Sequence, residues 1–174
     1  MNTLTTSWID KTVCVELGAL GPNLQKHIYD KIKTEMENSC DKELGYIFTV
    51  NDNIKILPNN SISTAGPTVF FPVRFQIESL KPVIGQKYTG RVGPILQIGI
   101  FVEVENKMKI LVLTKNMNGY VFDKNIFRKG KKDLVIKTGQ TITVELTMFQ
   151  FENQQFSFLG KLVKVHEPVD SDSD

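Results

Sequence analysis

The stretch Lys81-Pro82-Val83-Ile84-Gly85 marks the point at which the pattern of the sequence changes. On its N-terminal side the pattern predicts a strand, a helix and two long strands, and on its C-terminal side it predicts five short strands. We therefore predict two domains and a tail, over residues 1–82, 83–166 and 167–174. The tail carries four acidic residues among its eight positions, so we expect it to be disordered.

The composition is that of a folded protein without a strong overall charge. The chain has 174 residues, of which 41% are hydrophobic and 23% charged, which is typical of a domain with a packed core. The formal net charge is only +2, so any contact with nucleic acid must come from a local basic patch. Cys14 and Cys40 are too few for a disulfide scaffold or a zinc site, and we expect buried thiols in a reducing compartment.

The N-terminal residues give no sign of membrane targeting. Residues 1–12 are polar and lack the apolar core of a signal peptide. No apolar run approaches the length that a membrane-spanning helix needs. We therefore expect a soluble intracellular protein with no membrane partner.

Residues 1–82 combine the patterns of a helix and several strands. Residues 12–17 and 45–50 are apolar, β-branched runs that are typical of strands. After Gly21-Pro22, four apolar residues recur at every fourth position and predict one buried stripe of a helix: Leu24, Ile28, Ile32 and Met36. The longest predicted strand has five apolar residues at alternate positions: Val69, Phe71, Val73, Phe75 and Ile77. Together these patterns predict an α+β domain in which one helix, ending near Asn38, covers one face of a sheet.

Residues 83–166 predict an all-β domain. The five expected strands cover residues 87–92, 99–105, 108–113, 141–148 and 156–161. In the fourth, alternation predicts four core-facing residues: Ile142, Val144, Leu146 and Met148. Five strands with an irregular insert after the third match the OB barrel, which binds oligonucleotides over its second and third strands and adjoining loops.

Phe101 is a candidate RNA contact on the second of these strands. Alternation places it on the outer face together with Glu103 and Glu105, and an exposed aromatic ring can stack on any base. The two glutamates count against RNA lying directly across that face, and a neighbouring loop could instead cover the ring. Lys109, on the third strand, is a further candidate RNA contact.

The insert between the third and fourth strands is the one basic cluster of the sequence. It holds six cations against a single acid, Asp133: Lys124, Arg128, Lys129, Lys131, Lys132 and Lys137. The first five of these are candidate RNA contacts. Three aromatic residues precede or interrupt the cations: Tyr120, Phe122 and Phe127. Cations beside aromatic rings are the chemistry that binds single strands, although a solvated loop without a ligand would show the same composition.

Several short motifs across both domains give the chain a resemblance to a known family. They are Gly21-Pro22, Glu37-Asn38-Ser39-Cys40, Gly45-Tyr46-Ile47 with Val50, Ile62 to Gly66, Lys81-Pro82, Gly85, Gly90, Met108-Lys109 and Phe158-Leu159-Gly160. In their order and spacing, from Val13 to Val165, the chain resembles the stalk subunit of multisubunit RNA polymerases. That family includes the seventh subunit of RNA polymerase II and its archaeal equivalent.

The resemblance implies both a fold and a function. The fold would be a truncated ribonucleoprotein-like domain followed by an OB barrel of the S1 type. The N-terminal domain would dock on the RNA polymerase core subunits and on a smaller stalk partner of the fourth-subunit type, and the barrel would contact single-stranded nascent RNA. The protein would support transcription initiation in the nucleus, without a cofactor or chemistry of its own. The implied core-docking residues are Asp52, Asn53, Ile56, Leu57, Ile62, Thr64 and Gly66.

The sequence departs from the family at two positions of the expected RNA-binding face. Ile98 stands where an aromatic residue is common, and Leu113 stands where a histidine is common. Phe101 is therefore the one match to the typical aromatic positions, and more weight falls on the basic insert. The many asparagines and lysines suggest a divergent lineage such as a large DNA virus or a parasite, for which the cytoplasm or the virion would replace the nucleus.

Two other functional classes remain open at this stage. A free-standing OB protein in translation or RNA decay would share the barrel but would not need a docking domain. An enzyme would need a catalytic group, and His27 and His166 have no cysteine or paired carboxylate nearby in sequence. The glycines of Gly90-Arg91-Val92-Gly93 are too closely spaced for a phosphate-binding loop and open no helix.

Overall fold

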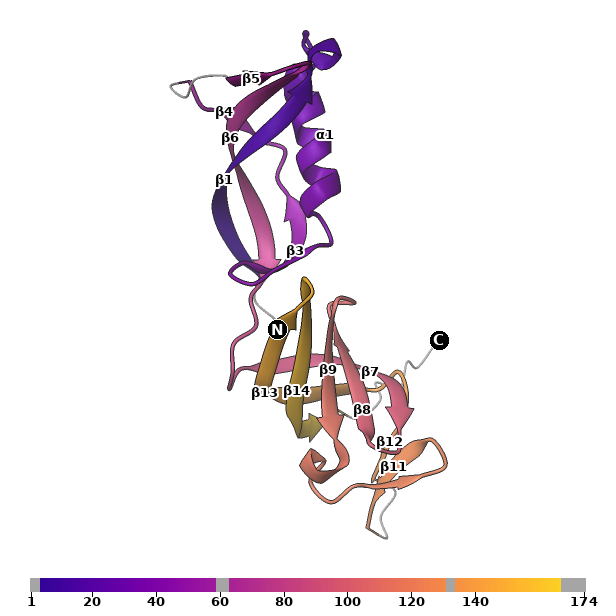
Figure 1. The fold of residues 1–174 in the computed structure, drawn as a ribbon. Helices are drawn as coiled ribbons and strands as arrows, with labels where there is room; N and C mark the ends of the chain where they lie inside the picture. The colour runs from indigo at the N-terminus through magenta and orange to yellow at the C-terminus, as the bar shows by residue number, and fades with distance from the viewer. Residues whose placement is uncertain (1–3, 59–62, 131–133, 167–174) are drawn as a thin grey trace, which may run out of the picture. The chain divides into compact units, whose positions relative to one another are not determined.

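The computed structural model describes residues 4–58, 63–130 and 134–166, so the predicted acidic tail lies outside the described residues. The chain divides into two compact units, and the boundary between them falls between Lys81 and Pro82. Figure 1 colours the first unit from indigo to magenta and the second from pink to yellow. The described residues form one α-helix, and none of their helical segments is long and apolar enough to cross a bilayer.

The first unit is built on an antiparallel sheet organised around one long strand. Its strands are β1 (Thr5–Glu16), β2 (Cys40–Asp41), β3 (Gly45–Val50), β4 (Lys55–Ile56), β5 (Ser63–Ala65) and β6 (Thr68–Leu80). One edge of β6 pairs with β1 along its whole length, and successive segments of the other edge pair with β5, β4 and β3. The short strand β2 continues the sheet beyond β3.

A single helix packs on one face of this sheet. Helix α1 (Leu24–Met36) buries Ile28 and Ile32 completely, while Leu24 and Met36 at its ends are half-buried against the same core. The alternating apolar residues of β6 all belong to this core. Figure 1 shows α1 lying beside the strands of this sheet. The stripe and the strand predicted from periodicity are therefore confirmed, and the helix ends two residues before Asn38.

Strand β1 is longer than its apolar run predicts. It begins at Thr5 instead of Thr12, because its backbone pairs with β6 from Thr5↔Ser79 to Glu16↔Thr68. The guanidinium of Arg74 donates to both carboxylate oxygens of Asp10 at 2.6 and 2.7 Å across these two strands. Polar residues thus extend an edge strand that hydrophobic patterning alone does not reveal. The two cysteines form no disulfide and are half-buried, so their expected burial is only partial.

The second unit contains a closed barrel of five strands, as the sequence predicts. The strands are β7 (Lys87–Leu96), β8 (Gly99–Val104), β9 (Met108–Leu113), β13 (Thr141–Glu152) and β14 (Gln155–Val165). Their order around the barrel is β13-β14-β9-β8-β7. It closes because β7 pairs with β13 and because β14 runs parallel to β9. The chain is therefore mostly β, with an all-β barrel in its second unit.

The alternation predicted for the second and fourth barrel strands holds in β8 but fails in the middle of β13. Tyr88, Val92 and the alternate residues of β8 fill the barrel, and burial raises the pKa of the Tyr88 phenol. In β13, a register shift between Leu146 and Met148 inserts an extra residue, and Met148 is 51% exposed. The prediction that Met148 faces the core is therefore wrong, because a β-bulge reverses the alternation.

The insert between β9 and β13 is also more regular than predicted. A short 3-10 helix (Thr114–Asn116) leads into a three-stranded antiparallel sheet of β10 (Val121–Asp123), β11 (Ile126–Lys129) and β12 (Leu134–Ile136). Lys124 and Asn125 join β10 to β11 with φ values of 46° and 67°, which are those of a two-residue hairpin turn. The expectation of an irregular insert is wrong because asparagine supports this turn without a glycine.

We expect Phe75→Ala to destabilise the first unit strongly. Phe75 has no exposed surface, so removing its ring should lower the free energy of unfolding by about 3–5 kcal/mol. Urea denaturation of the full chain measures this loss. Glu78→Ala, on the opposite face of the same strand, should change it by less than about 1 kcal/mol. Equal losses of unfolding free energy in both variants would contradict this prediction, because the buried ring would then stabilise the unit no more than Glu78 does.

A matched glycine pair tests the closure of the barrel. A Cβ at Gly99 would lie 2.1 Å from the Val112 carbonyl oxygen, and the φ of +155° also disfavours other residues. Gly99→Ala should therefore cost about 3 kcal/mol of unfolding free energy. In Gly93→Ala the new Cβ lies 3.4 Å from the flexible Glu103 side chain and should be tolerated. A thermal midpoint as high in Gly99→Ala as in Gly93→Ala would contradict this geometry.

Candidate nucleic-acid interface

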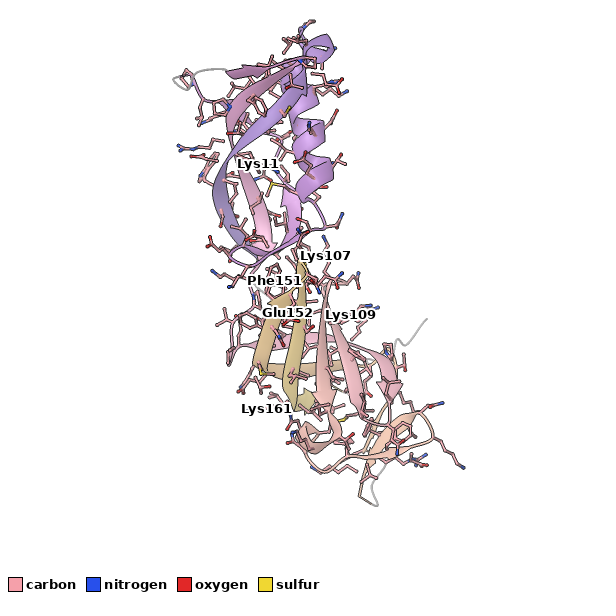
Figure 2. All side chains as sticks on the ribbon, viewed as in Figure 1. Lys11, Lys107, Lys109, Phe151, Glu152 and Lys161 are labelled. Atoms are coloured by element: carbon pink, nitrogen blue, oxygen red, sulfur yellow. The ribbon has the colours of Figure 1, made fainter. Side chains whose placement is uncertain are left out.

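The outer face of strands β7, β8 and β9 carries a row of alternating charges. Backbone pairing places Arg91 opposite Glu103, and Glu103 opposite Lys109. The Lys109 ammonium lies 3.4 Å from a Glu103 carboxylate oxygen, and Lys107 lies in the turn before β9 (Figure 2). Phe101, half-buried, lies on the same face of β8 and pairs with Leu111. This face therefore offers one partly exposed ring, and its lysine is already paired with a carboxylate.

The described cations of the insert lie at its surface. Arg128 is paired with Asp123 at 3.1 Å, and Lys124 is exposed in the turn that joins β10 to β11. The Lys129 ammonium lies 5.7 Å from the centre of the Tyr120 ring, within reach of a cation–π interaction. Two further candidates, Lys131 and Lys132, lie outside the described residues. The insert therefore presents positive charge to solvent, partly offset by Asp123.

The aromatic residues of the insert form its core instead of a stacking surface. Phe127 is completely buried, and Tyr120 is only 8% exposed. Phe122 is half-buried and packs edge-on against Phe127, with ring centres 5.6 Å apart. Burial also raises the pKa of the Tyr120 phenol. The expectation that these rings stack on bases is therefore not supported, because the small sheet needs them for its own packing.

A groove of about 1190 Å³ runs between the insert and the barrel. Three cations line it, each from a different part of the chain: Arg91 on β7, Arg128 on β11, and Lys137 just after β12. Gln140 and His166 also line the groove, as does the buried Tyr120. The sequence analysis missed this grouping, because its members are far apart in the chain. The pairing of β7 with β13, from Arg91↔Thr141 to Lys87↔Glu145, brings Arg91 beside the start of β13.

Hydrogen bonds hold one wall of the groove in place. The Gln140 amide donates to the His166 carbonyl oxygen at 3.1 Å, and the His166 backbone N–H donates to the Thr141 carbonyl oxygen at 3.0 Å. The imidazole Nε2 shares a 2.8 Å hydrogen bond with the Thr143 hydroxyl, which in turn lies 3.0 Å from the Thr89 hydroxyl. His166 is thus positioned by hydroxyl and amide groups. Among residues 4–58, 63–130 and 134–166, no three His, Cys, Asp or Glu side chains gather as metal ligands would.

The candidate docking residues of the first unit lie in different surroundings. Asp52 and Asn53 are exposed, Ile56 is 37% exposed on β4, and Leu57 is half-buried. Ile54, which lies between Asn53 and Ile56 in the sequence, is 2% exposed and belongs to the core. Thr64 lies on β5 and pairs with Val69 of β6. Gly66 lies exposed in the turn after β5, and Ile62 is outside the described residues.

Comparison with known proteins finds similarity in both sequence and structure. Residues 81–155 match the family model of the S1 RNA binding domain. The chain is 33% identical over 99 residues to DNA-directed RNA polymerase II subunit RPB7 of Saccharomyces cerevisiae, and it spans 56% of that relative's length with 56% of its own. The barrel unit is thus similar to S1 RNA-binding domains, and more than half of the chain is similar to a polymerase subunit.

Two solved structures of RNase R from Mycoplasma genitalium also match, the apo form and a complex with ribose-methylated single-stranded RNA. Each is 21% identical, covers 46% of this chain and 13% of the other chain, and has a TM-score of 0.39. At this level of likeness the two structures support no conclusion about this chain.

The basic insert can be tested by removing three of its lysines. If it contacts RNA, Lys129→Ala, Lys131→Ala and Lys132→Ala combined should weaken binding of a single-stranded oligonucleotide and reduce the slope of log affinity against log salt by about 2. Fluorescence anisotropy at several salt concentrations measures both quantities. A variant with Lys26, Lys33 and Lys42 of the first unit changed to alanine removes the same charge as a control. Unchanged affinity in the insert variant would exclude these lysines as RNA contacts.

Proposed function

We propose that the chain is a noncatalytic stalk subunit of a DNA-directed RNA polymerase and that its barrel contacts nascent RNA. The observation that carries this proposal is the 33% identity to the RPB7 subunit over 99 residues. The match of residues 81–155 to the S1 RNA binding domain and the closed five-stranded barrel support the RNA contact. The protein then acts by binding and positioning, and needs no cofactor.

In this proposal the two parts of the chain have different tasks. Residues 1–82 form a truncated ribonucleoprotein-like domain that docks on the polymerase core and on a smaller stalk partner of the fourth-subunit type. The exposed Asp52 and Asn53, with Ile56 beside them, are available for the core contact. Residues 83–166 carry the RNA contact, and residues 167–174 form an acidic tail. The protein works in the nucleus during initiation, or in the cytoplasm or a virion if its lineage is viral.

A second candidate function is a free-standing RNA-binding protein of translation or RNA decay. The observation that favours it is that the S1 family match begins at residue 81 and leaves almost all of the first unit unassigned. Such a protein would bind RNA through the same barrel but would have no polymerase partner. Affinity purification of the tagged full chain from its source cells, followed by mass spectrometry, separates the two functions.

We expect this purification to recover the large polymerase subunits. A chain that binds single-stranded RNA but recovers none of them would contradict the stalk function and favour the second candidate. The double variant Asp52→Lys and Ile56→Asp should reduce recovery about tenfold or more, because it places wrong charge at the proposed core contact.

The control for this variant changes the same kinds of residue elsewhere. Asp30→Lys with Val121→Asp alters one exposed acid on α1 and one 66% exposed valine on β10. Core recovery should stay within about twofold of the unmodified chain. Circular dichroism establishes that both double variants are folded. Equal recovery from the two variants would show that the tip near Asp52 is not the core contact.

A further inference from the structure

We propose that the groove between the insert and the barrel binds the phosphodiester backbone of single-stranded RNA, with Arg91, Arg128 and Lys137 as its phosphate contacts. This inference rests on the proposed RNA-binding function and assigns it a path on the surface. It differs from binding over the outer face of β8 and β9, which the OB architecture alone would suggest.

The charge of the groove lining is the first argument. Three of the lining residues that the structure describes are cationic, and none of these described residues is an aspartate or a glutamate. One of the three, Arg128, is paired with Asp123 at 3.1 Å, and Asp123 is not among the described lining residues. On the outer face of β8 and β9, by contrast, Lys109 is 3.4 Å from Glu103, and Phe101 shares that face with the same glutamate. A phosphate approaching the strand face would meet the Glu103 carboxylate, whereas the described lining of the groove offers it three cations and no carboxylate.

The rigidity of the groove is the second argument. Arg91 and Arg128 project from strands, and the segment carrying Lys137 is tied to the barrel by backbone hydrogen bonds. The Gly139 N–H donates to the Val92 carbonyl at 2.7 Å, and the Val92 N–H donates to the Gln140 carbonyl at 2.9 Å. The Gln140 side chain also accepts a hydrogen bond from the Lys137 backbone N–H at 3.2 Å. Cations held on fixed backbone lose less entropy when they bind a ligand.

The size and chemistry of the groove indicate a polymer rather than a small molecule. Its volume of about 1190 Å³ exceeds the usual range of small-ligand pockets. Among the described lining residues there is no exposed aromatic platform, since Tyr120 is buried and Lys129 lies over its ring. Contacts to phosphate position a strand but do not read its bases. We therefore expect binding with little preference between base compositions.

The test compares two triple variants of the full chain that lose the same charge. The groove variant carries Arg91→Gln, Arg128→Gln and Lys137→Gln, and the control variant carries Lys42→Gln, Lys87→Gln and Lys115→Gln. All six side chains are exposed, so both variants should keep the thermal midpoint of the unmodified chain. Binding of labelled 16-nucleotide oligo(U) and oligo(A) is measured by fluorescence anisotropy at several salt concentrations.

We expect the groove variant to lose affinity at least about tenfold for both oligonucleotides. Its slope of log affinity against log salt should fall by about 2, since three phosphate contacts are lost. The control variant should stay within about twofold of the unmodified chain. A separate variant, Lys109→Gln, measures what the strand face contributes.

Other results overturn the proposal in distinguishable ways. A greater loss in Lys109→Gln than in the groove variant would place the RNA on the strand face and leave the RNA-binding function intact. Equal loss in both variants would show general charge attraction without a defined path. A loss in the groove variant for oligo(U) but not for oligo(A) would contradict a backbone contact. If the unmodified chain binds neither oligonucleotide, the RNA-binding function itself fails, and the groove proposal fails with it.

Discussion

Closure of the barrel is the constraint on which the surface of the second unit depends. The antiparallel pairing of β7 with β13 and the parallel pairing of β14 with β9 leave no open strand edge in this sheet. Closure requires close backbone approach, and a Cβ at Gly160 would lie only 2.8 Å from the Ile110 side chain. Because closure fixes which residues point outward, it also brings Arg91 beside the beginning of β13 and thereby completes one wall of the groove.

The insert follows a second constraint, which is that a small sheet needs a core of its own. Of the aliphatic residues in its three short strands, Ile136 alone is fully buried, and Phe127 with Tyr120 fills the space that remains. The aromatic rings therefore point inward, and the cations between them point to solvent. A sequence that alternates rings and lysines is typical of nucleic-acid binding, but here the same alternation is what separates the inside of a small sheet from its outside.

These constraints explain which features the sequence could predict. Periodicity identifies strands and helices whose apolar residues face one core, so α1, β6 and β8 follow from it. The exposure of Met148 does not follow from periodicity, because a β-bulge changes the alternation without a local signal such as glycine. The groove is a property of strand register: Arg91 and Lys137 are 46 positions apart, and only the folded barrel brings them to one surface.

The low net charge of the chain bears on how the two units would work together under the proposed function. A protein with a formal charge of +2 attracts RNA only weakly from a distance, and a few phosphate contacts give modest affinity in physiological salt. A protein docked on a polymerase does not need a higher affinity for RNA, because the emerging transcript is held nearby at high effective concentration. A free-standing protein would have to capture RNA from solution with the same few cations. The charge balance of the chain thus favours a barrel that works while the other unit holds it in place.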